Sequence, residues 1–90
     1  MPVEHFEDDD QSYLAWLDAH PDGFVIDRDR TGTTDWYLHR ASCAQVHDRS
    51  DPRRLWTHER LKDCAPGADP LVAWAMRAGA ELLHCGQCRP

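Results

Sequence analysis

The chain has 90 residues, a formal net charge of −6 and four cysteines. A chain of this length forms one domain and buries only about 60–65% of its unfolded surface, so a cross-link would add useful stability. No apolar run approaches the roughly 18–20 residues that span a membrane, and the first ten residues lack the basic and apolar regions of a secretion signal. We therefore expect a cytoplasmic protein, and a reducing compartment favours a metal site over disulfides.

The charge is distributed unevenly along the chain. Residues 1–27 carry eight acidic residues and neither Lys nor Arg, whereas residues 28–62 carry eight basic residues against five acidic ones. The overall negative charge opposes non-specific binding to nucleic acid, but the basic middle is compatible with a local binding face.

The pattern predicts a loose acidic lead-in over residues 1–9 and a single zinc-binding domain over residues 10–90. A first helix begins with Asp10 as its cap and ends before Pro21-Asp22-Gly23, a sequence typical of turns. Apolar residues at spacings of three and four give this helix one buried face: Tyr13, Leu14, Trp16 and Leu17.

Two strands follow, over residues 24–27 and 36–39, because both segments are rich in β-branched or aromatic residues. The polar segment between them, residues 28–35, predicts an antiparallel hairpin. Alternation along the second strand places Trp36 and Leu38 on one face and Tyr37 and His39 on the other.

The second half of the chain is less regular. Residues 48–52 predict a loop, residues 55–57 a short strand or a helical turn, and residues 60–63 a strand that leads into Cys64. A second helix has Asp69 as its cap, Pro70 at its first position and Gly79 after its end. Residues 81–84 are then extended up to Cys85.

The last residues hold half of a tetrahedral zinc site, because Cys85 and Cys88 are separated by two residues. The favoured second half is Cys43 with Cys64, each at the end of an extended segment. The resulting fold class is α+β: a small, zinc-stapled, zinc-ribbon-like domain with an antiparallel hairpin or short sheet and two helices.

An alternative site replaces Cys64 with His39. In an extended strand the side chains of His39 and Cys43 would be about 13 Å apart, so this alternative requires a turn at Ala41-Ser42. His39 could otherwise hydrogen-bond to a ligand of an all-cysteine site. Two further alternatives are four free thiols and a redox Cys-x-x-Cys pair.

Several segments resemble a small actinobacterial zinc-ribbon-like module that is associated with restriction, defence and mobile-element proteins. They are Tyr37–Cys43, His20–Val25, Lys62–Cys64, the helix that contains Trp74, and the final Cys-x-x-Cys-x-Pro. The resemblance covers residues 13–90 and implies that Cys43, Cys64, Cys85 and Cys88 are the ligands of a structural Zn²⁺.

For function, we expect a non-enzymatic recognition or accessory module. In the first hypothesis its partner is nucleic acid, because Arg binds phosphates and aromatic rings stack on bases. The candidate binding residues are Arg40, Arg49, Arg53, Arg54, Arg60, Lys62 and Trp56.

Two other hypotheses remain open. The chain could bind or inhibit a basic protein partner through its acidic residues Glu4, Glu7, Asp8, Asp9 and Asp10. It could also be a metal-dependent hydrolase that uses its central histidines, His47 and His58, although no nucleophile and base spacing identifies a mechanism.

Overall fold

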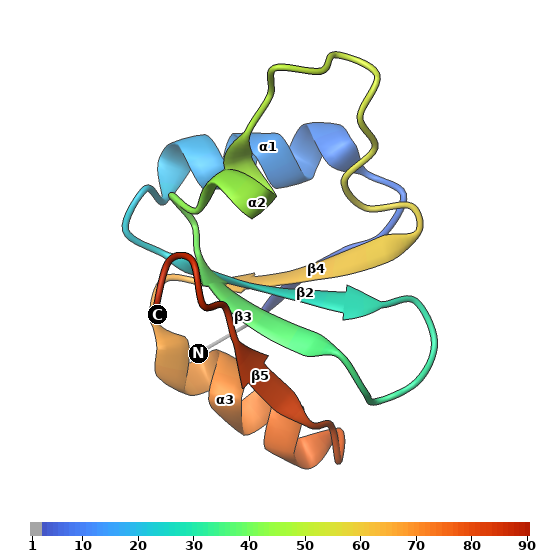
Figure 1. The fold of residues 1–90 in the computed structure, drawn as a ribbon, viewed down its shortest axis with the longest axis vertical. Coiled ribbons are helices and arrows are strands. Elements are labelled where there is room, and N and C mark those ends of the chain that lie inside the picture. Colours follow the sequence, from blue (N-terminus) through green and yellow to red (C-terminus); the bar gives the residue numbers. More distant parts are fainter. Residues whose placement is uncertain (1–2) are drawn as a thin grey trace.

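A computed structural model describes residues 3–90, which form an α+β fold with one five-stranded mixed sheet and three helices (Figure 1). The helices are α1 (Asp10–Ala19), α2 (Ala44–His47) and α3 (Ala68–Arg77). The strands are β1 (Glu4–Phe6), β2 (Phe24–Asp29), β3 (Trp36–Arg40), β4 (Arg60–Ala65) and β5 (Leu82–His84). The predicted α+β class is confirmed, with a five-stranded sheet and three helices where a hairpin or short sheet and two helices were predicted.

The strand order in the sheet is β1-β4-β2-β3-β5. The predicted hairpin is present, since β2 and β3 pair antiparallel with Val25 opposite His39. Strand β2 also pairs antiparallel with β4, and β4 with β1. The last strand, β5, pairs parallel with β3, so the carboxyl ends of these two strands meet at the same end of the sheet.

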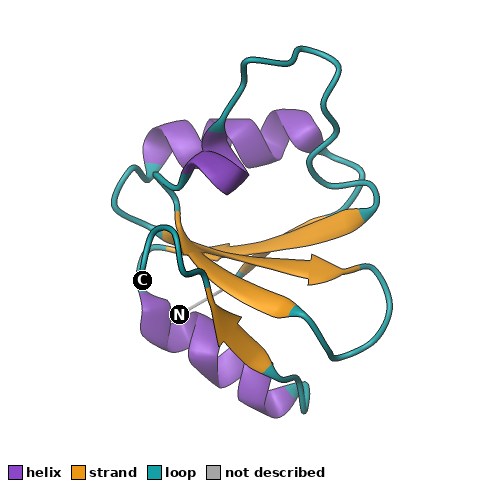
Figure 2. Cartoon of the chain, in the orientation of Figure 1, coloured by secondary structure: helices purple, strands orange, loops and turns teal. Residues whose placement is uncertain are grey.

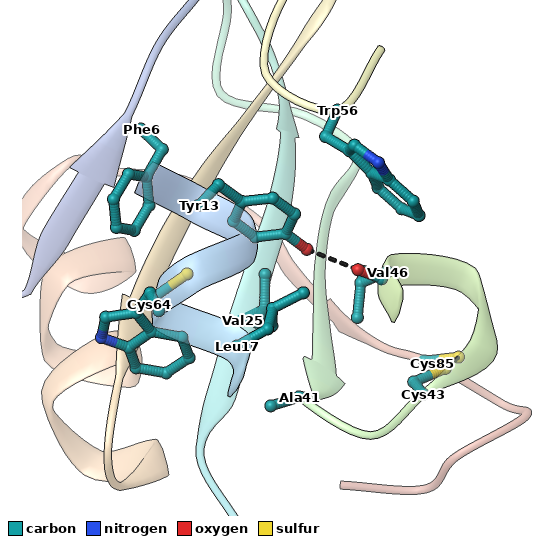
Figure 3. Close-up of a cluster of buried hydrophobic side chains, with 11 residues drawn as sticks. Phe6, Tyr13, Leu17, Val25, Ala41, Cys43, Val46, Trp56, Cys64 and Cys85 are labelled. Atoms are coloured by element: carbon teal, nitrogen blue, oxygen red, sulfur yellow. Dashed lines mark hydrogen bonds between the residues drawn. The ribbon is translucent and has the colours of Figure 1, made fainter. Parts of the chain in front are cut away.

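Helices α1 and α2 cover one face of the sheet and α3 covers the other (Figures 1 and 2). The alternation predicted for β3 is confirmed: Trp36 and Leu38 belong to the apolar cluster under α3. The cluster on the opposite face contains Tyr13 and Leu17 of α1 (Figure 3). Trp16 of the same helix also belongs to it. The hydroxyl of Tyr13 donates to the Val46 carbonyl at 2.7 Å, which joins α1 to α2.

Helix α1 begins one residue before the predicted position. The carboxylate of Asp9 accepts a hydrogen bond from the Ser12 backbone N–H at 3.1 Å and so caps a free amide of the first turn. The turn after the helix depends on Gly23, because a Cβ at that position would lie 2.7 Å from the Trp16 ring.

Helix α3 ends as the sequence predicts. Gly79 adopts a φ of +68°, and the Ala80 N–H donates to the Ala75 carbonyl at 2.9 Å, which forms a Schellman cap. The helix begins at Ala68, so Pro70 lies in the first turn, where its missing N–H costs no helical hydrogen bond.

Three sequence predictions need correction. In the lead-in, Met1 and Pro2 lie outside the described residues, but Glu4–Phe6 form a strand that pairs with β4. A third helix is present, the single turn α2. Residues 55–57 are neither strand nor helix, because the Asp10 carboxylate accepts hydrogen bonds from the backbone N–H groups of Trp56 and Thr57 and holds the segment as a loop on α1. None of the helices within residues 3–90 is long and apolar enough to cross a bilayer.

Candidate metal centre

Four potential metal ligands meet where β3 and β5 end: His39, Cys43, Cys85 and Cys88. Parallel pairing sets Leu38 beside His84, and the Cys85 N–H donates to the Leu38 carbonyl at 3.0 Å. The residues that follow this pair, His39 in β3 and Cys85 just after β5, are therefore adjacent potential ligands on the side of the sheet that faces α1 and α2. Neighbouring parallel strands supply one ligand each.

A tight turn after each strand brings back a second ligand. The Cys43 N–H donates to the Arg40 carbonyl at 2.9 Å, which closes a turn over Ala41 and Ser42. This is the turn that the alternative site with His39 requires. After β5, the Arg89 N–H donates to the Cys85 carbonyl at 3.0 Å and closes the turn that carries Cys88.

The spacing of the ligand atoms fits a tetrahedral ion. All four lie within 4.8 Å of one another, and the sulfurs of Cys43 and Cys85 are 3.9 Å apart. A Zn–S bond of about 2.3 Å in a tetrahedron gives a sulfur separation of roughly 3.8 Å. A disulfide would require a separation of about 2.05 Å, so the two thiols are free.

The imidazole of His39 is only 2% exposed, and its Nδ1 has no hydrogen-bond partner among the described residues. Burial lowers the pKa of His39, so the ring is neutral at neutral pH, as a metal ligand must be. A buried nitrogen without a partner lowers the stability of the fold, and a metal ion bound among these four residues would give His39 a partner.

Backbone N–H groups of α2 and of the turn after β5 bond to the sulfurs. Burial raises the pKa of the Cys43 thiol to about 12, although a hydrogen bond from the Gln45 backbone N–H acts in the opposite direction. For Cys85 burial acts in the same direction, but hydrogen bonds from the Cys88 and Gln87 N–H groups outweigh it and lower the pKa. Such N–H groups stabilise metal-bound thiolates in the same way.

Arg40 holds the last turn against the sheet. Its backbone N–H donates to the Cys88 sulfur at 3.3 Å, and its guanidinium donates to the carbonyls of Cys88 and Arg89 at 3.1 and 3.3 Å. The amide of Gln45 on α2 donates to the side chain of Gln87 at 2.9 Å. These bonds fix the positions of the turns that carry the ligands.

The prediction that Cys64 is a ligand is not supported by this geometry. Cys64 lies opposite Val25, and Val25 lies opposite His39, so Cys64 is two strands away from the cluster. Its side chain is fully buried in the core under α1, away from the Cys43 and Cys85 sulfurs (Figure 3). Burial raises the pKa of this thiol well above its ordinary value, so Cys64 acts as a small apolar residue.

The predicted nucleic-acid-binding residues differ in how far their charges are paired within the chain. Arg49 pairs with Asp18 at 2.8 Å, and Arg60 and Lys62 pair with Asp27 at 2.9 and 3.1 Å. Arg40 is used in the metal centre. Arg53 and Arg54 are exposed: the Arg53 guanidinium lies 3.9 Å from Asp51, the longest of these ion pairs, and Arg54 donates to the Gln45 carbonyl.

Two of these candidates are buried, contrary to prediction. Trp56 is 4% exposed because its ring packs on Tyr13 and the Arg54 guanidinium covers it at 3.8 Å, so it offers no free face to a base. Lys62 is also 4% exposed, and its ammonium donates to the Trp56 carbonyl at 2.6 Å.

Most of the acidic segment is bonded within the chain. Glu7 and Asp8 pair with Arg30 at 3.3 and 2.8 Å, Asp9 caps α1, and Asp10 accepts three hydrogen bonds from Trp56 and Thr57. Of the central histidines, His58 bonds to Asp8 and His47 is exposed on α2. Neither belongs to the four-residue cluster.

Comparisons of the chain with models of protein families, with curated proteins and with solved structures found no match.

Proposed function

We propose that the chain is a non-enzymatic recognition module whose fold is closed by a structural Zn²⁺ bound to His39, Cys43, Cys85 and Cys88. The observation that carries this proposal is the convergence of four ligand atoms within 4.8 Å from two adjacent strand ends. One imidazole and three thiolates are a preferred zinc donor set, and four protein ligands leave no open position for a substrate.

A bound zinc would hold the C-terminal strand in place. Strand β5 has three residues and lies at the edge of the sheet, so its pairing with β3 alone gives limited stability. Two ligands before α2 and two after β5 would cross-link segments that are more than 40 residues apart in sequence. The role of the ion in this proposal is structural.

The partner we propose is nucleic acid, bound through the loop of residues 48–59, which stands out from the body of the fold beside α1 (Figure 1). Arg53 and Arg54 in this loop are exposed: the Arg53 guanidinium has a long contact with Asp51 at 3.9 Å, and Arg54 donates to the neutral Gln45 carbonyl. We favour this partner over a basic protein because the acids that would bind such a protein are largely engaged within the chain.

Fluorescence anisotropy with a labelled single-stranded oligonucleotide tests this proposal. The Arg53→Glu/Arg54→Glu double variant should lose binding while it retains one zinc per chain. Arg53→Glu alone is compared with Arg77→Glu on α3, an equal charge change at an exposed site on the other face of the sheet. Undiminished binding by the double variant, or equal losses in the two single variants, would overturn the proposal.

A further inference from the structure

A pocket of about 360 Å³ lies on the α1 side of the sheet, between β2, β4 and the loop that precedes β4. Three basic side chains line it: Arg54 from the loop, and Arg60 and Lys62 from β4. It does not include any of the four metal ligands.

The acidic side chains of the pocket offset only part of this positive charge. A single oxygen of Asp27, Oδ1, accepts from both Arg60 Nε at 2.9 Å and Lys62 Nζ at 3.1 Å. One carboxylate thus faces two cations. The other acid in the lining, Glu59, is exposed and forms no ion pair within residues 3–90.

Arg54 adds a third positive charge, and it forms no ion pair within residues 3–90. Its guanidinium donates to the Gln45 carbonyl at 2.7 Å and stacks on Trp56. A guanidinium has five N–H donors, and the hydrogen bonds described for Arg54 and Arg60 use only some of them. Donors on two arginines therefore remain for a ligand with several acceptor oxygens.

We propose that this pocket binds a phosphate group, with the guanidinium groups of Arg54 and Arg60 as its donors. Guanidinium groups match the oxygens of a phosphate, and a volume of this size lies at the lower end of small-ligand pockets, so the phosphate can carry an attached group. The inference rests on the proposed function where the phosphate belongs to a nucleic-acid strand. A small phosphorylated molecule is the other source of the same chemistry.

Nuclear magnetic resonance of the zinc-loaded full chain can locate the ligand. The backbone amides are followed during titration with inorganic phosphate and, separately, with a single-stranded eight-nucleotide DNA. We expect both probes to shift the amides of Asp27, Arg60 and Lys62, the pocket residues that lie outside the loop of residues 48–59. Shifts spread over the whole surface, with no preference for this pocket, would overturn the inference.

The second readout is the affinity for each probe, measured with three variants that each change the net charge by one unit. Arg54→Gln removes a donor and should weaken binding roughly tenfold. Glu59→Gln removes an acid that no contact requires and should tighten binding about threefold by reducing repulsion. Arg77→Gln on α3 is the control and should change neither affinity. Equal effects of Arg54→Gln and Arg77→Gln, or no gain from Glu59→Gln, would contradict the inference.

The two probes separate this inference from the proposed function. If the oligonucleotide shifts the amides of the loop of residues 48–59 but not those of Asp27, Arg60 and Lys62, the proposed function stands and the pocket inference is wrong. If inorganic phosphate binds in the pocket and the oligonucleotide does not bind at all, the inference holds for small phosphorylated molecules and the nucleic-acid proposal is wrong. If neither probe binds, both are wrong.

Discussion

His39 and Cys64 face the same side of the sheet, but β2 lies between them and places Val25 in the same cross-strand row. Adjacent strands are about 4.8 Å apart, so two strand spacings separate these side chains by roughly 10 Å. Zinc bonds of about 2.0–2.3 Å cannot bridge that distance to one ion. Of the two residues, His39 is the one that lies beside β5, so it is the one that joins Cys85.

Arg40 should control how firmly the metal is held. Arg40→Gln removes the guanidinium bonds to the carbonyls of Cys88 and Arg89, and loss of such supporting contacts typically costs 10–100-fold in metal affinity. We expect zinc to transfer to a chromophoric chelator at least about tenfold faster than in the unmodified chain. Arg49→Gln, which breaks exposed bonds to Asp18 and to the Leu14 carbonyl away from the metal centre, is the control. Identical transfer rates in both variants would show that Arg40 has no such role.

Asp63 should be among the most sensitive residues for folding. It is fully buried and accepts bonds from Arg28, from His5 Nδ1 at 2.6 Å and from Trp74 Nε1 at 3.0 Å, which join β1, β2, β4 and α3. Asp63→Asn leaves the Arg28 charge without its partner and should lower the free energy of unfolding by about 3–5 kcal/mol. Asp29→Asn, an exposed site on β2, should change it by less than about 0.5 kcal/mol in the same urea titration.

Asp10 should make stability depend on pH in the acid range. Burial raises the pKa of Asp10, but hydrogen bonds from the Thr57 side chain and the backbone N–H groups of Trp56 and Thr57 bring it below its ordinary value of 3.8. A lowered carboxyl pKa stabilises the fold above the unfolded value, and the contribution disappears as the pH falls through the folded pKa.

The Asp10→Ala variant isolates this contribution. At pH 7 it should be about 2 kcal/mol less stable than the unmodified chain, because bonds to a charged acceptor are lost. The difference in urea unfolding should stay constant from pH 8 to pH 5 and shrink below about pH 4. A stability difference that grows on acidification would show that the pKa of Asp10 is not lowered by folding.

Gly23 should tolerate no side chain. A Cβ there would lie 2.7 Å from the Trp16 ring and 3.2 Å from the Ala65 carbonyl, so Gly23→Ala should cost about 1–3 kcal/mol. Gly67→Ala is the matched control, because nothing lies within 4 Å of its added Cβ and its φ of −126° suits any residue. Thermal unfolding of the two variants checks the contrast, and equal melting temperatures would refute it.

The elements that the sequence predicts correctly depend on local signals. Helices α1 and α3 follow from apolar spacing and from caps such as Gly79, and the hairpin follows from two β-rich segments with a polar connection. Strand β1 has no such pattern. It is held by pairing with β4 and by the bond between His5 and Asp63, which are 58 residues apart.

The metal centre, too, can be predicted from the sequence only where local signals specify it. The Cys85 and Cys88 pair is a local motif and belongs to the cluster, whereas the choice between His39 and Cys64 depends on which strand neighbours β5. Strand order is a non-local property, and each residue is the last but one of its strand, so its position within the strand does not choose between them. The burial of Trp56 has a similar origin, since Tyr13 and Arg54 cover its ring.

The most direct test of the metal centre is the zinc content of the purified chain and of two variants, measured by elemental analysis. The unmodified chain should contain one zinc per chain, and Cys64→Ala should retain it at a modest cost in stability. His39→Ala should fall well below one zinc per chain, because it removes a ligand. A Cys64→Ala variant that loses its zinc while His39→Ala keeps one full equivalent would contradict this account.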